Sequence, residues 1–213
     1  RPTPLTRRFE EHFGTLTGSG SFYDPHTLIR NDTFIQPESD DFYYTDAISE
    51  EAVQMVAKAG EADDPFFLYV AYTAPHWPLH APAEDIAKYR GKYEAKGWDA
   101  IRTARHEEMK GAGLVDSKWE ISPRDELAPP WEEVSEKDWY DARMAVYAAM
   151  IDRMDQGIGK IVAELRRQAV FENTLIMFFS DNGGSCEFLM EEGILQMAPG
   201  TTRDGKAVRS GNV

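Results

Sequence analysis

The sequence lacks several features that would assign it to a special class of protein. One cysteine among 213 residues excludes a disulfide framework and a thiolate metal cluster within the chain. No apolar run approaches the roughly 20 residues of a membrane span, since the longest dense runs have strand length. Lys and Arg number 23 against 37 Asp and Glu, and a net charge of −14 lacks the basic footprint of nucleic-acid binding. We therefore expect no membrane span and no nucleic-acid partner.

The composition nevertheless suits a folded domain. Hydrophobic residues make up 42% of the chain and aromatic residues 12%, which is enough to fill a core and excludes wholesale disorder. The chain opens at Arg1 rather than at a methionine and closes in a loop-like composition. We expect it to be an interior part of a longer protein, cut at both ends.

The first half of the chain predicts irregular structure, then a helix, then a strand. Residues 1–45 are rich in turn-forming residues and predict irregular structure packed on a larger body. Apolar residues recur at helical spacing over residues 46–59, with Thr45 as the expected N-cap and Gly60 at the end. Residues 66–72 are continuously apolar, which is typical of a strand buried on both faces of a parallel sheet.

The second half predicts more helices and a second buried strand. Residues 84–112 are expected to be helical in two pieces, broken near Gly97, and the proline-rich residues 113–134 to form a surface excursion. A long amphipathic helix is predicted over residues 136–168, followed by a buried strand over residues 174–179. This order of elements predicts an α/β fold with a largely parallel central sheet flanked by helices.

Polar side chains follow both predicted strands. The first strand leads into residues 73–82, which contain His76, and the second leads into Asp181 and Asn182. Because ligands bind beyond the carboxyl ends of the strands in open α/β sheets, these side chains are expected to converge at one edge.

Asp181 and Asn182 admit two interpretations. Their side chains offer hard oxygen donors, which suit calcium or magnesium better than zinc. The Asp-Asn-Gly sequence is also ordinary turn chemistry, since Asn and Gly tolerate positive φ. A single carboxylate carries too little charge to hold a divalent ion, so a metal site here needs further ligands from elsewhere.

His76 also admits two interpretations. It lies between Pro75 and Pro78, which keep its backbone out of a helix. An imidazole held in this way could act as a general acid or bind an oxyanion. Alternatively, it is a loop imidazole that only makes hydrogen bonds. His80 lies four residues later, but Pro78 prevents the helix that would place both rings on one face.

The combination of these segments resembles the type I sulfatases. Residues 66–82, Phe-Phe-Leu-Tyr-Val-Ala-Tyr-Thr-Ala-Pro-His-Trp-Pro-Leu-His-Ala-Pro, resemble the Pro-His-x-Pro segment of that family. Residues 173–184, which end in Ser-Asp-Asn-Gly-Gly, resemble its Asp-Asn-Gly metal segment, and residues 147–159 resemble its long helix. Residues 14–25 and 88–93 are similar to the bacterial arylsulfatase branch.

The resemblance covers essentially the whole chain and implies a fold and a chemistry. It implies that residues 1–213 are the central portion of a sulfatase catalytic domain with an alkaline-phosphatase-like α/β fold, incomplete at both ends. The family hydrolyses sulfate esters with a formylglycine nucleophile held by a calcium-type ion. By resemblance, Asp181 and Asn182 would ligate the ion, Asp181 would also help to deprotonate the nucleophile, and His76 would contact the sulfate and protonate the leaving group. The resemblance implies no role for His80.

The chain departs from the family pattern in its nucleophile. It contains no Cys/Ser-x-Pro-x-Arg motif, from which formylglycine is made, and it lacks the first pair of metal-binding aspartates. We therefore expect the chain alone to be inactive and the nucleophile to lie elsewhere in the longer protein.

Alternative functions are a phosphoester or phosphonate monoester hydrolase of the same superfamily, or a non-catalytic relative. The Pro-His-Trp-Pro-Leu segment favours sulfate. The expected partner is a small-molecule or glycan sulfate ester. The expected location is periplasmic or secreted, as for many members of the family.

Overall fold

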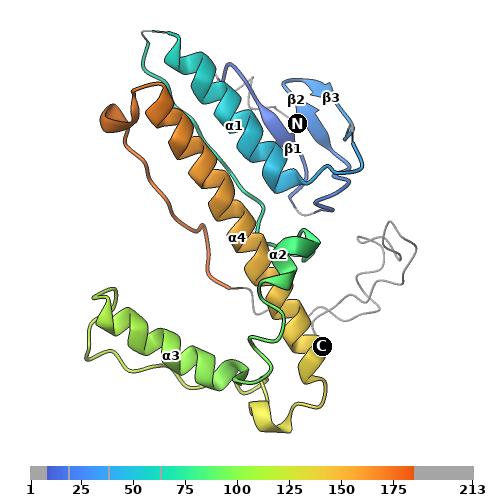
Figure 1. Cartoon of the computed structure of the whole chain (residues 1–213), viewed down its shortest axis with the longest axis vertical. Coiled ribbons are helices and arrows are strands. Elements are labelled where there is room, and N and C mark those ends of the chain that lie inside the picture. Colours follow the sequence, from blue (N-terminus) through green and yellow to red (C-terminus); the bar gives the residue numbers. More distant parts are fainter. Residues whose placement is uncertain (1–8, 19, 38, 63, 185–213) are drawn as a thin grey trace. The chain divides into compact units, whose positions relative to one another are not determined.

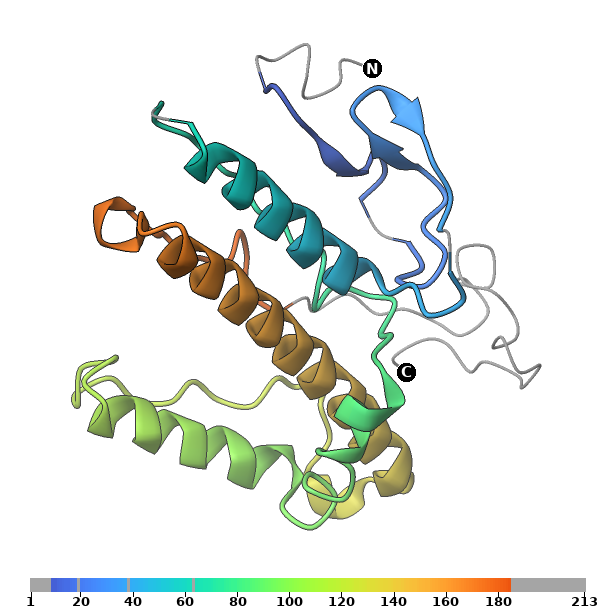
Figure 2. The same cartoon turned by 45° about the horizontal axis from the view of Figure 1, so that its top comes forward.

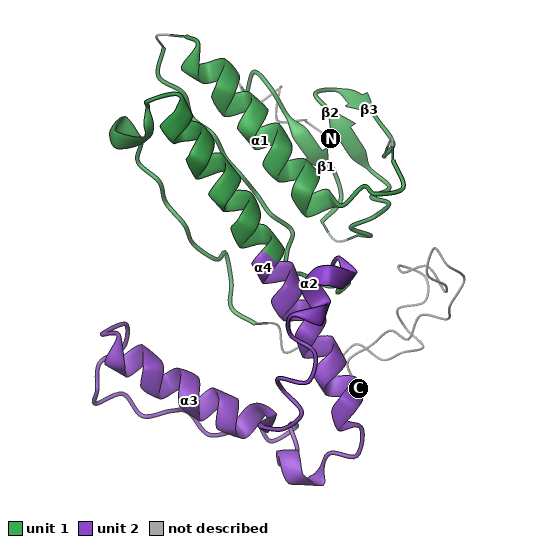
Figure 3. Ribbon diagram, viewed as in Figure 1, with its two compact units in different colours: residues 1–80, 153–213 green, residues 81–152 purple. Residues whose placement is uncertain are grey.

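The computed structural model (Figure 1) describes residues 9–184 apart from residues 19, 38 and 63. The chain divides into two units, shown in Figure 3. Unit 1 comprises residues 1–80 and 153–213, and unit 2 comprises residues 81–152. None of the described helices combines the length and the apolar character that are needed to cross a membrane.

A small antiparallel sheet forms where the sequence predicts only irregular structure. It contains β1 (Phe13–Thr15), β2 (Leu28–Arg30) and β3 (Thr33–Phe34) in that order, and both neighbouring pairs are antiparallel. Asn31 has a φ of 55° in the turn between β2 and β3, a conformation that asparagine tolerates. Strands of two or three residues are too short to show an alternating pattern, so the sequence did not reveal them.

Helix α1 (Tyr44–Gly60) confirms the predicted helix but begins one residue before the predicted cap. Thr45 was expected to be the N-cap, and the structure corrects this: Tyr43 holds that position and Thr45 is buried in the first turn. The reason is a long-range partner. The backbone N–H of Tyr44 donates to the carbonyl of Phe22 at 2.7 Å, which satisfies one of the free N–H groups at the start of the helix.

Helix α1 packs against the C-terminal half of α4 (Lys137–Arg167) to form the core of unit 1, and the small sheet lies on the other side of α1 in both Figure 1 and Figure 2. The long helix predicted over residues 136–168 is thus confirmed. An ion pair joins the two helices, with Arg153 Nε 2.8 Å and Nη2 2.7 Å from the carboxylate oxygens of Asp46. The buried side chains of the core are Ala52, Val56, Ile161 and Leu165.

The two predicted buried strands are not strands among the described residues. Residues 66–72 and 174–179 form no β-ladder there, and the sheet that is present is antiparallel rather than parallel. In residues 174–179 the apolar side chains are exposed, with Leu175 at 83%. A strand needs a neighbouring strand to satisfy its backbone groups and layers to cover its faces. The described residues supply neither to this segment.

Residues 66–72 differ because one of their faces is covered. Leu68 and Val70 pack against the core of unit 1, whereas Phe67 is 74% and Tyr69 65% exposed. Burial therefore alternates along the segment, which is the side-chain period of a strand. The segment has the side-chain arrangement of a strand with one uncovered face.

Unit 2 contains α2 (Ala83–Ala87), α3 (Gly97–Gly111), the short helix η2 (Trp131–Glu133) and the first part of α4. The two helical pieces predicted over residues 84–112 are present, but the first ends already at Ala87, so the break is longer than predicted and ends at Gly97. Gly97 has a φ of 70°, and a Cβ atom there would lie 2.1 Å from the Trp131 ring, so only glycine fits.

Asp141 of α4 organises the segment between α2 and α3. Its side chain, 1% exposed, accepts backbone N–H groups from Gly91, Tyr93 and Glu94 and a hydrogen bond from the Arg90 guanidinium. Burial alone raises the pKa of Asp141, but these three N–H donors and the guanidinium outweigh it and hold the pKa below its usual value. Asp141 is thus a buried carboxylate whose partners all lie in unit 2.

Candidate active site

The loop that carries His76, residues 73–80, begins with a tight turn. The backbone N–H of His76 donates to the Thr73 carbonyl at 2.8 Å, and both Pro75 and Pro78 lie in this part of the chain. Pro78 is buried, whereas the His76 side chain is exposed. The loop therefore presents its imidazole outward from a backbone that is partly packed against unit 1.

The His76 ring is oriented by its own loop. Its Nδ1 atom lies 2.6 Å from the Trp77 carbonyl oxygen, which carries no proton, so Nδ1 must be the donor. The other nitrogen, Nε2, is left for an external group. When the ring is protonated, Nε2–H can donate to an anionic oxygen, as general acid catalysis or anion binding requires.

The far end of the loop is held by a cluster of rings that we call the aromatic anchor: Phe22, Tyr23, Tyr43 and His80. The Tyr43 hydroxyl donates to the His80 carbonyl at 2.8 Å, and the Phe22 N–H donates to His80 Nδ1 at 3.4 Å. Burial raises the pKa of Tyr43 and lowers the pKa of His80. Tyr43 is therefore protonated and His80 neutral near pH 7, as both hydrogen bonds require. Local spacing did not single out Phe22, Tyr23 or Tyr43, because aromatic residues in a turn-rich segment have no distinctive spacing, and the family resemblance implied no role for His80.

The near end of the loop is held by Tyr72. Ser49 donates its single hydroxyl proton to the Thr45 carbonyl at 2.7 Å, so the Tyr72 hydroxyl is the donor in its 2.9 Å contact with Ser49 Oγ. Gly157 makes room for this pair: a Cβ atom there would lie 2.1 Å from Ser49 Oγ and 3.1 Å from the Tyr72 hydroxyl. Tyr72 and the aromatic anchor thus hold the loop at both ends.

Among the described residues, Asp181 and Asn182 form hydrogen bonds only with their immediate neighbours. The Asn182 N–H donates to Asp181 Oδ1 at 3.0 Å, and Asn182 Nδ2 donates to the Gly183 carbonyl at 2.8 Å. The Ser180 hydroxyl also donates to the Asn182 carbonyl. These are the bonds of a turn, and they leave both side chains exposed.

The donor chemistry of this turn fits a hard cation, but the number of donors does not complete a site. Carboxylate and amide oxygens are the ligands that calcium and magnesium prefer. Within residues 9–184, where the structure describes them, no three His, Cys, Asp or Glu side chains are grouped closely enough to hold a metal ion. Nor does a hydrogen bond or ion pair in this part of the chain join His76 to Asp181 or Asn182. Their convergence stays a prediction.

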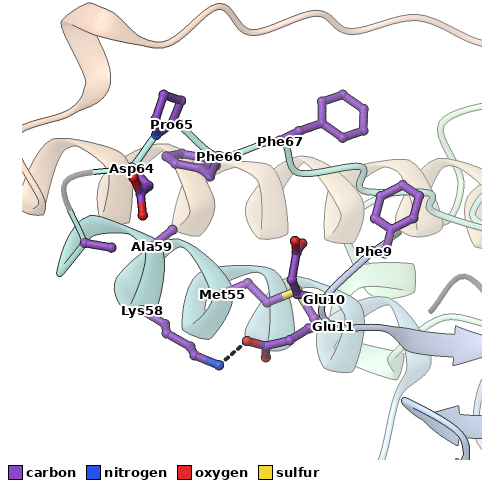
Figure 4. Close-up of a pocket in the computed structure, with 11 residues that line it drawn as sticks. Phe9, Glu10, Glu11, Met55, Lys58, Ala59, Asp64, Pro65, Phe66 and Phe67 are labelled. Atoms are coloured by element: carbon purple, nitrogen blue, oxygen red, sulfur yellow. Dashed lines mark hydrogen bonds and ion pairs between the residues drawn. The ribbon is translucent and has the colours of Figure 1, made fainter. Parts of the chain in front are cut away.

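A concavity of unit 1 lies elsewhere (Figure 4). It has a volume of about 700 Å³, and the Lys58–Glu11 ion pair lies on its wall. None of the predicted site residues lines it, so it is a feature separate from the candidate site. Its lining residues are Phe9, Glu10, Glu11, Met55, Lys58, Ala59, Ala62, Asp64, Pro65, Phe66 and Phe67.

Comparison with known proteins gives consistent matches over most of the chain. The model of the family described as Sulfatase matches residues 4–209. An uncharacterised sulfatase of Schizosaccharomyces pombe is 32% identical, over 92% of this chain and 38% of its own. An arylsulfatase of Klebsiella aerogenes is 33% identical, over 86% of this chain and 41% of its own.

A solved structure supports the same assignment. The crystal structure of Ps i-CgsB in complex with k-i-k-neocarrahexaose is similar with a TM-score of 0.51 and 25% identity, covering 80% of this chain and 32% of that one. The chain thus spans about two fifths of the length of the two curated relatives. From these matches, the chain belongs to the sulfatase family and has the alkaline-phosphatase-like α/β fold of that family.

Proposed function

We propose that this chain is the central portion of the catalytic domain of a sulfuric ester hydrolase that cleaves sulfate monoesters in the manner of an arylsulfatase. The observation that carries the proposal is the orientation of His76, whose Nδ1 is occupied by the Trp77 carbonyl and whose Nε2 is left for a substrate. Membership of the sulfatase family supports it. Residues 113–134 are proposed to be a surface excursion of this domain.

The exposed apolar segments support the proposal that the domain continues beyond this chain. Residues 66–72 bury alternate side chains, and residues 174–179 bury almost none. We propose that both become strands of a largely parallel central sheet when residues of the longer protein pair with them and cover them. The relatives, of which this chain spans about 40%, are long enough to supply such residues.

In the proposed reaction, an oxygen of the nucleophile forms a bond to sulfur while the bond between sulfur and the ester oxygen breaks, and negative charge develops on the departing oxygen. Protonated His76 donates the Nε2 proton to that oxygen, so the product leaves as a neutral alcohol or phenol. The bond from Nδ1 to the Trp77 carbonyl holds the ring during the transfer. Such positioned proton donation contributes about 10²–10⁴-fold to the rate.

Asp181 and Asn182 would contribute oxygen ligands to a divalent metal, which we propose to be calcium or magnesium. When bound, the metal supplies positive charge that offsets the charge of the sulfate group. The Asp181 carboxylate is also proposed to accept a proton from the nucleophile. The formylglycine nucleophile is expected in the rest of the protein, because the chain has no Cys/Ser-x-Pro-x-Arg motif. The isolated chain is therefore expected to be inactive.

The proposed substrate is an aryl sulfate or a sulfated glycan. The Klebsiella aerogenes relative is an arylsulfatase, and the similar crystal structure holds k-i-k-neocarrahexaose. Family members are often exported, so we propose a periplasmic or secreted location. A phosphoester or phosphonate hydrolase is the second candidate, because its differences from a sulfatase lie largely in the nucleophile.

The test uses the full-length, metal-loaded protein and two matched substrates, an aryl sulfate and the phosphate monoester of the same phenol. We expect the sulfate to be hydrolysed with the higher kcat/KM. Peptide mapping by mass spectrometry should find an aldehyde at the Cys or Ser of a Cys/Ser-x-Pro-x-Arg peptide. Preferential phosphate hydrolysis with an unmodified threonine at that position would favour the phosphoester hydrolase. Failure to hydrolyse either ester would favour a non-catalytic relative.

A further inference from the structure

We propose that His80 is a positioning residue, whose attachment to the aromatic anchor fixes the loop that presents His76 to the substrate. This inference rests on the proposed function, because it concerns how the proposed acid is held. His80 does not itself contact reacting atoms in this account. It acts through the backbone of residues 73–80.

Within the part of the chain that the structure describes, the hydrogen bonds of His76 are all local. Its backbone N–H bonds to Thr73 and its ring bonds to Trp77, both within three residues. Bonds inside a loop define the shape of that loop but not its place on the protein. The direction of the imidazole therefore depends on what holds the two ends of residues 73–80.

The His80 end of the loop is tied to the start of α1 through the backbone of a single residue, Phe22. The Phe22 carbonyl accepts the Tyr44 N–H at 2.7 Å, and the Phe22 N–H donates to His80 Nδ1 at 3.4 Å. The neighbouring Tyr43 hydroxyl donates to the His80 carbonyl at 2.8 Å. Both the ring and the backbone of His80 are thus attached to the first turn of a long helix.

Histidine is a residue type that suits this attachment at position 80. The 3.4 Å bond is long for an N–H···N contact, so packing of the His80 ring also contributes to the attachment. The His80 ring lies edge-on to Phe22 with centroids 6.2 Å apart and 5.6 Å from the Tyr23 ring. Burial keeps the imidazole neutral by lowering its pKa, so Nδ1 can accept. Histidine provides both the flat ring that packs against Phe22 and Tyr23 and the acceptor atom Nδ1.

The consequence for catalysis is specific to proton transfer. Misplacing a reacting group by about 1 Å can cost about 10²-fold in rate. If loosening of the loop misplaces His76, the loss falls mainly on substrates whose leaving group needs a proton. Activated phenol sulfates, whose leaving groups depart as stable anions, should lose much less.

The test measures kcat/KM of the full-length, metal-loaded enzyme for aryl sulfates whose phenols span a range of pKa values. His80→Ala removes the ring, and we expect a loss of about 10-fold to 10²-fold for the poorest leaving groups and a much smaller loss for the best. His80→Asn retains an acceptor oxygen near Nδ1 and should recover part of the loss. Tyr43→Phe removes only the bond to the His80 carbonyl and should steepen the leaving-group dependence in the same direction.

The matched control is His12→Asn. His12 is another histidine of unit 1 whose pKa is lowered by burial, and its backbone bonds to Asn31, away from residues 73–80. It should leave the leaving-group dependence unchanged. Equal losses for all substrates in His80→Asn and Tyr43→Phe, or no loss in either, would overturn the inference. His80→Asn and Tyr43→Phe therefore test the positioning role even if His80→Ala fails to fold.

Wild type and His76→Ala in the same assay separate the two hypotheses. Sulfate hydrolysis that depends on His76, with His80 variants that behave like the control, overturns the positioning role alone. Absence of sulfate hydrolysis in the wild type overturns the proposed function, and the positioning role with it.

Discussion

The loop that carries His76 and the turn that carries Asp181 follow two similar apolar segments, yet the described chain holds them very differently. Residues 73–80 are tied at one end through Tyr72 and at the other through the aromatic anchor. Up to residue 184, where the description of the structure ends, Asp181 and Asn182 bond only to each other and to adjacent residues. The described residues thus hold both ends of the loop that carries the proposed acid, whereas among them the turn that carries the proposed metal ligands has only local bonds.

The largest expected effect concerns Asp181, which lies in the turn with only local bonds among the described residues. In the full-length protein, Asp181→Ala should abolish turnover, because it removes the only carboxylate of the proposed ligand pair. Asp181 is exposed, so the melting temperature of the metal-free protein should not change. Sulfatase assays check the loss of turnover, thermal unfolding checks the melting temperature, and calcium titration calorimetry checks the loss of a metal ligand.

The control for Asp181 is Asp116→Ala, which changes another exposed aspartate. It should leave both activity and calcium affinity intact. Near-normal turnover and calcium affinity in Asp181→Ala would remove the assignment of Asp181 as a ligand.

Asp141 differs from Asp181 because its side chain is buried and accepts several hydrogen bonds. Asp141→Asn replaces an acceptor with an amide that meets the N–H groups of Gly91, Tyr93 and Glu94. We expect the free energy of unfolding of the full-length protein to fall by about 2–4 kcal/mol at pH 7. Urea unfolding of the wild type and the variant measures this difference in the free energy of unfolding. Asp138→Asn, which changes the exposed partner of Arg90, should cost less than about 1 kcal/mol.

The pH dependence of this effect has a definite sign. Because the folded state lowers the pKa of Asp141, its contribution is fully present above the unfolded pKa of about 3.9. It is lost as the pH falls through the folded pKa. The difference in the free energy of unfolding between wild type and Asp141→Asn should therefore become smaller below about pH 4. A difference in the free energy of unfolding that does not change with pH would show that the carboxylate charge does not provide the stabilisation.

The smallest expected effect concerns the packing beside the His76 loop. Gly157→Ala places a methyl group against Ser49 and Tyr72 and should destabilise the protein by about 1–3 kcal/mol, despite the better helix propensity of alanine. Gly159→Ala is the matched control on the same helix, because a Cβ there meets nothing within 4 Å. It should stabilise the protein by up to about 1 kcal/mol. Equal effects of the two changes on thermal unfolding would contradict this account of the packing.

The sequence predicted those parts of the fold whose signal is local. Helices α1 and α4 follow from long apolar periodicity, and the break at Gly97 follows from a glycine that the backbone needs. The segments 66–72 and 174–179 have the composition of buried strands but no strand partner among the described residues, because pairing is a long-range property. Composition alone therefore predicted a sheet that this part of the chain does not form by itself.

The candidate site was predictable only in part, for a related reason. His76, Asp181 and Asn182 were identified from their positions after apolar segments and from the family resemblance. The aromatic anchor was not, because Phe22 and Tyr43 meet His80 from 58 and 37 residues away in the sequence. Contacts over such separations leave no mark in local spacing.

The most direct test of the central claim compares wild type with His76→Ala in the full-length, metal-loaded enzyme, across aryl sulfates of increasing phenol pKa. Our account predicts a loss of kcat/KM that grows along the series, within about 10²–10⁴-fold for the least activated sulfates. His106→Ala, which changes a histidine of α3 whose Nε2 atom lies 3.0 Å from the Trp119 carbonyl oxygen, should show no such trend. A loss that is the same for every sulfate would contradict the role of His76 as the proton donor.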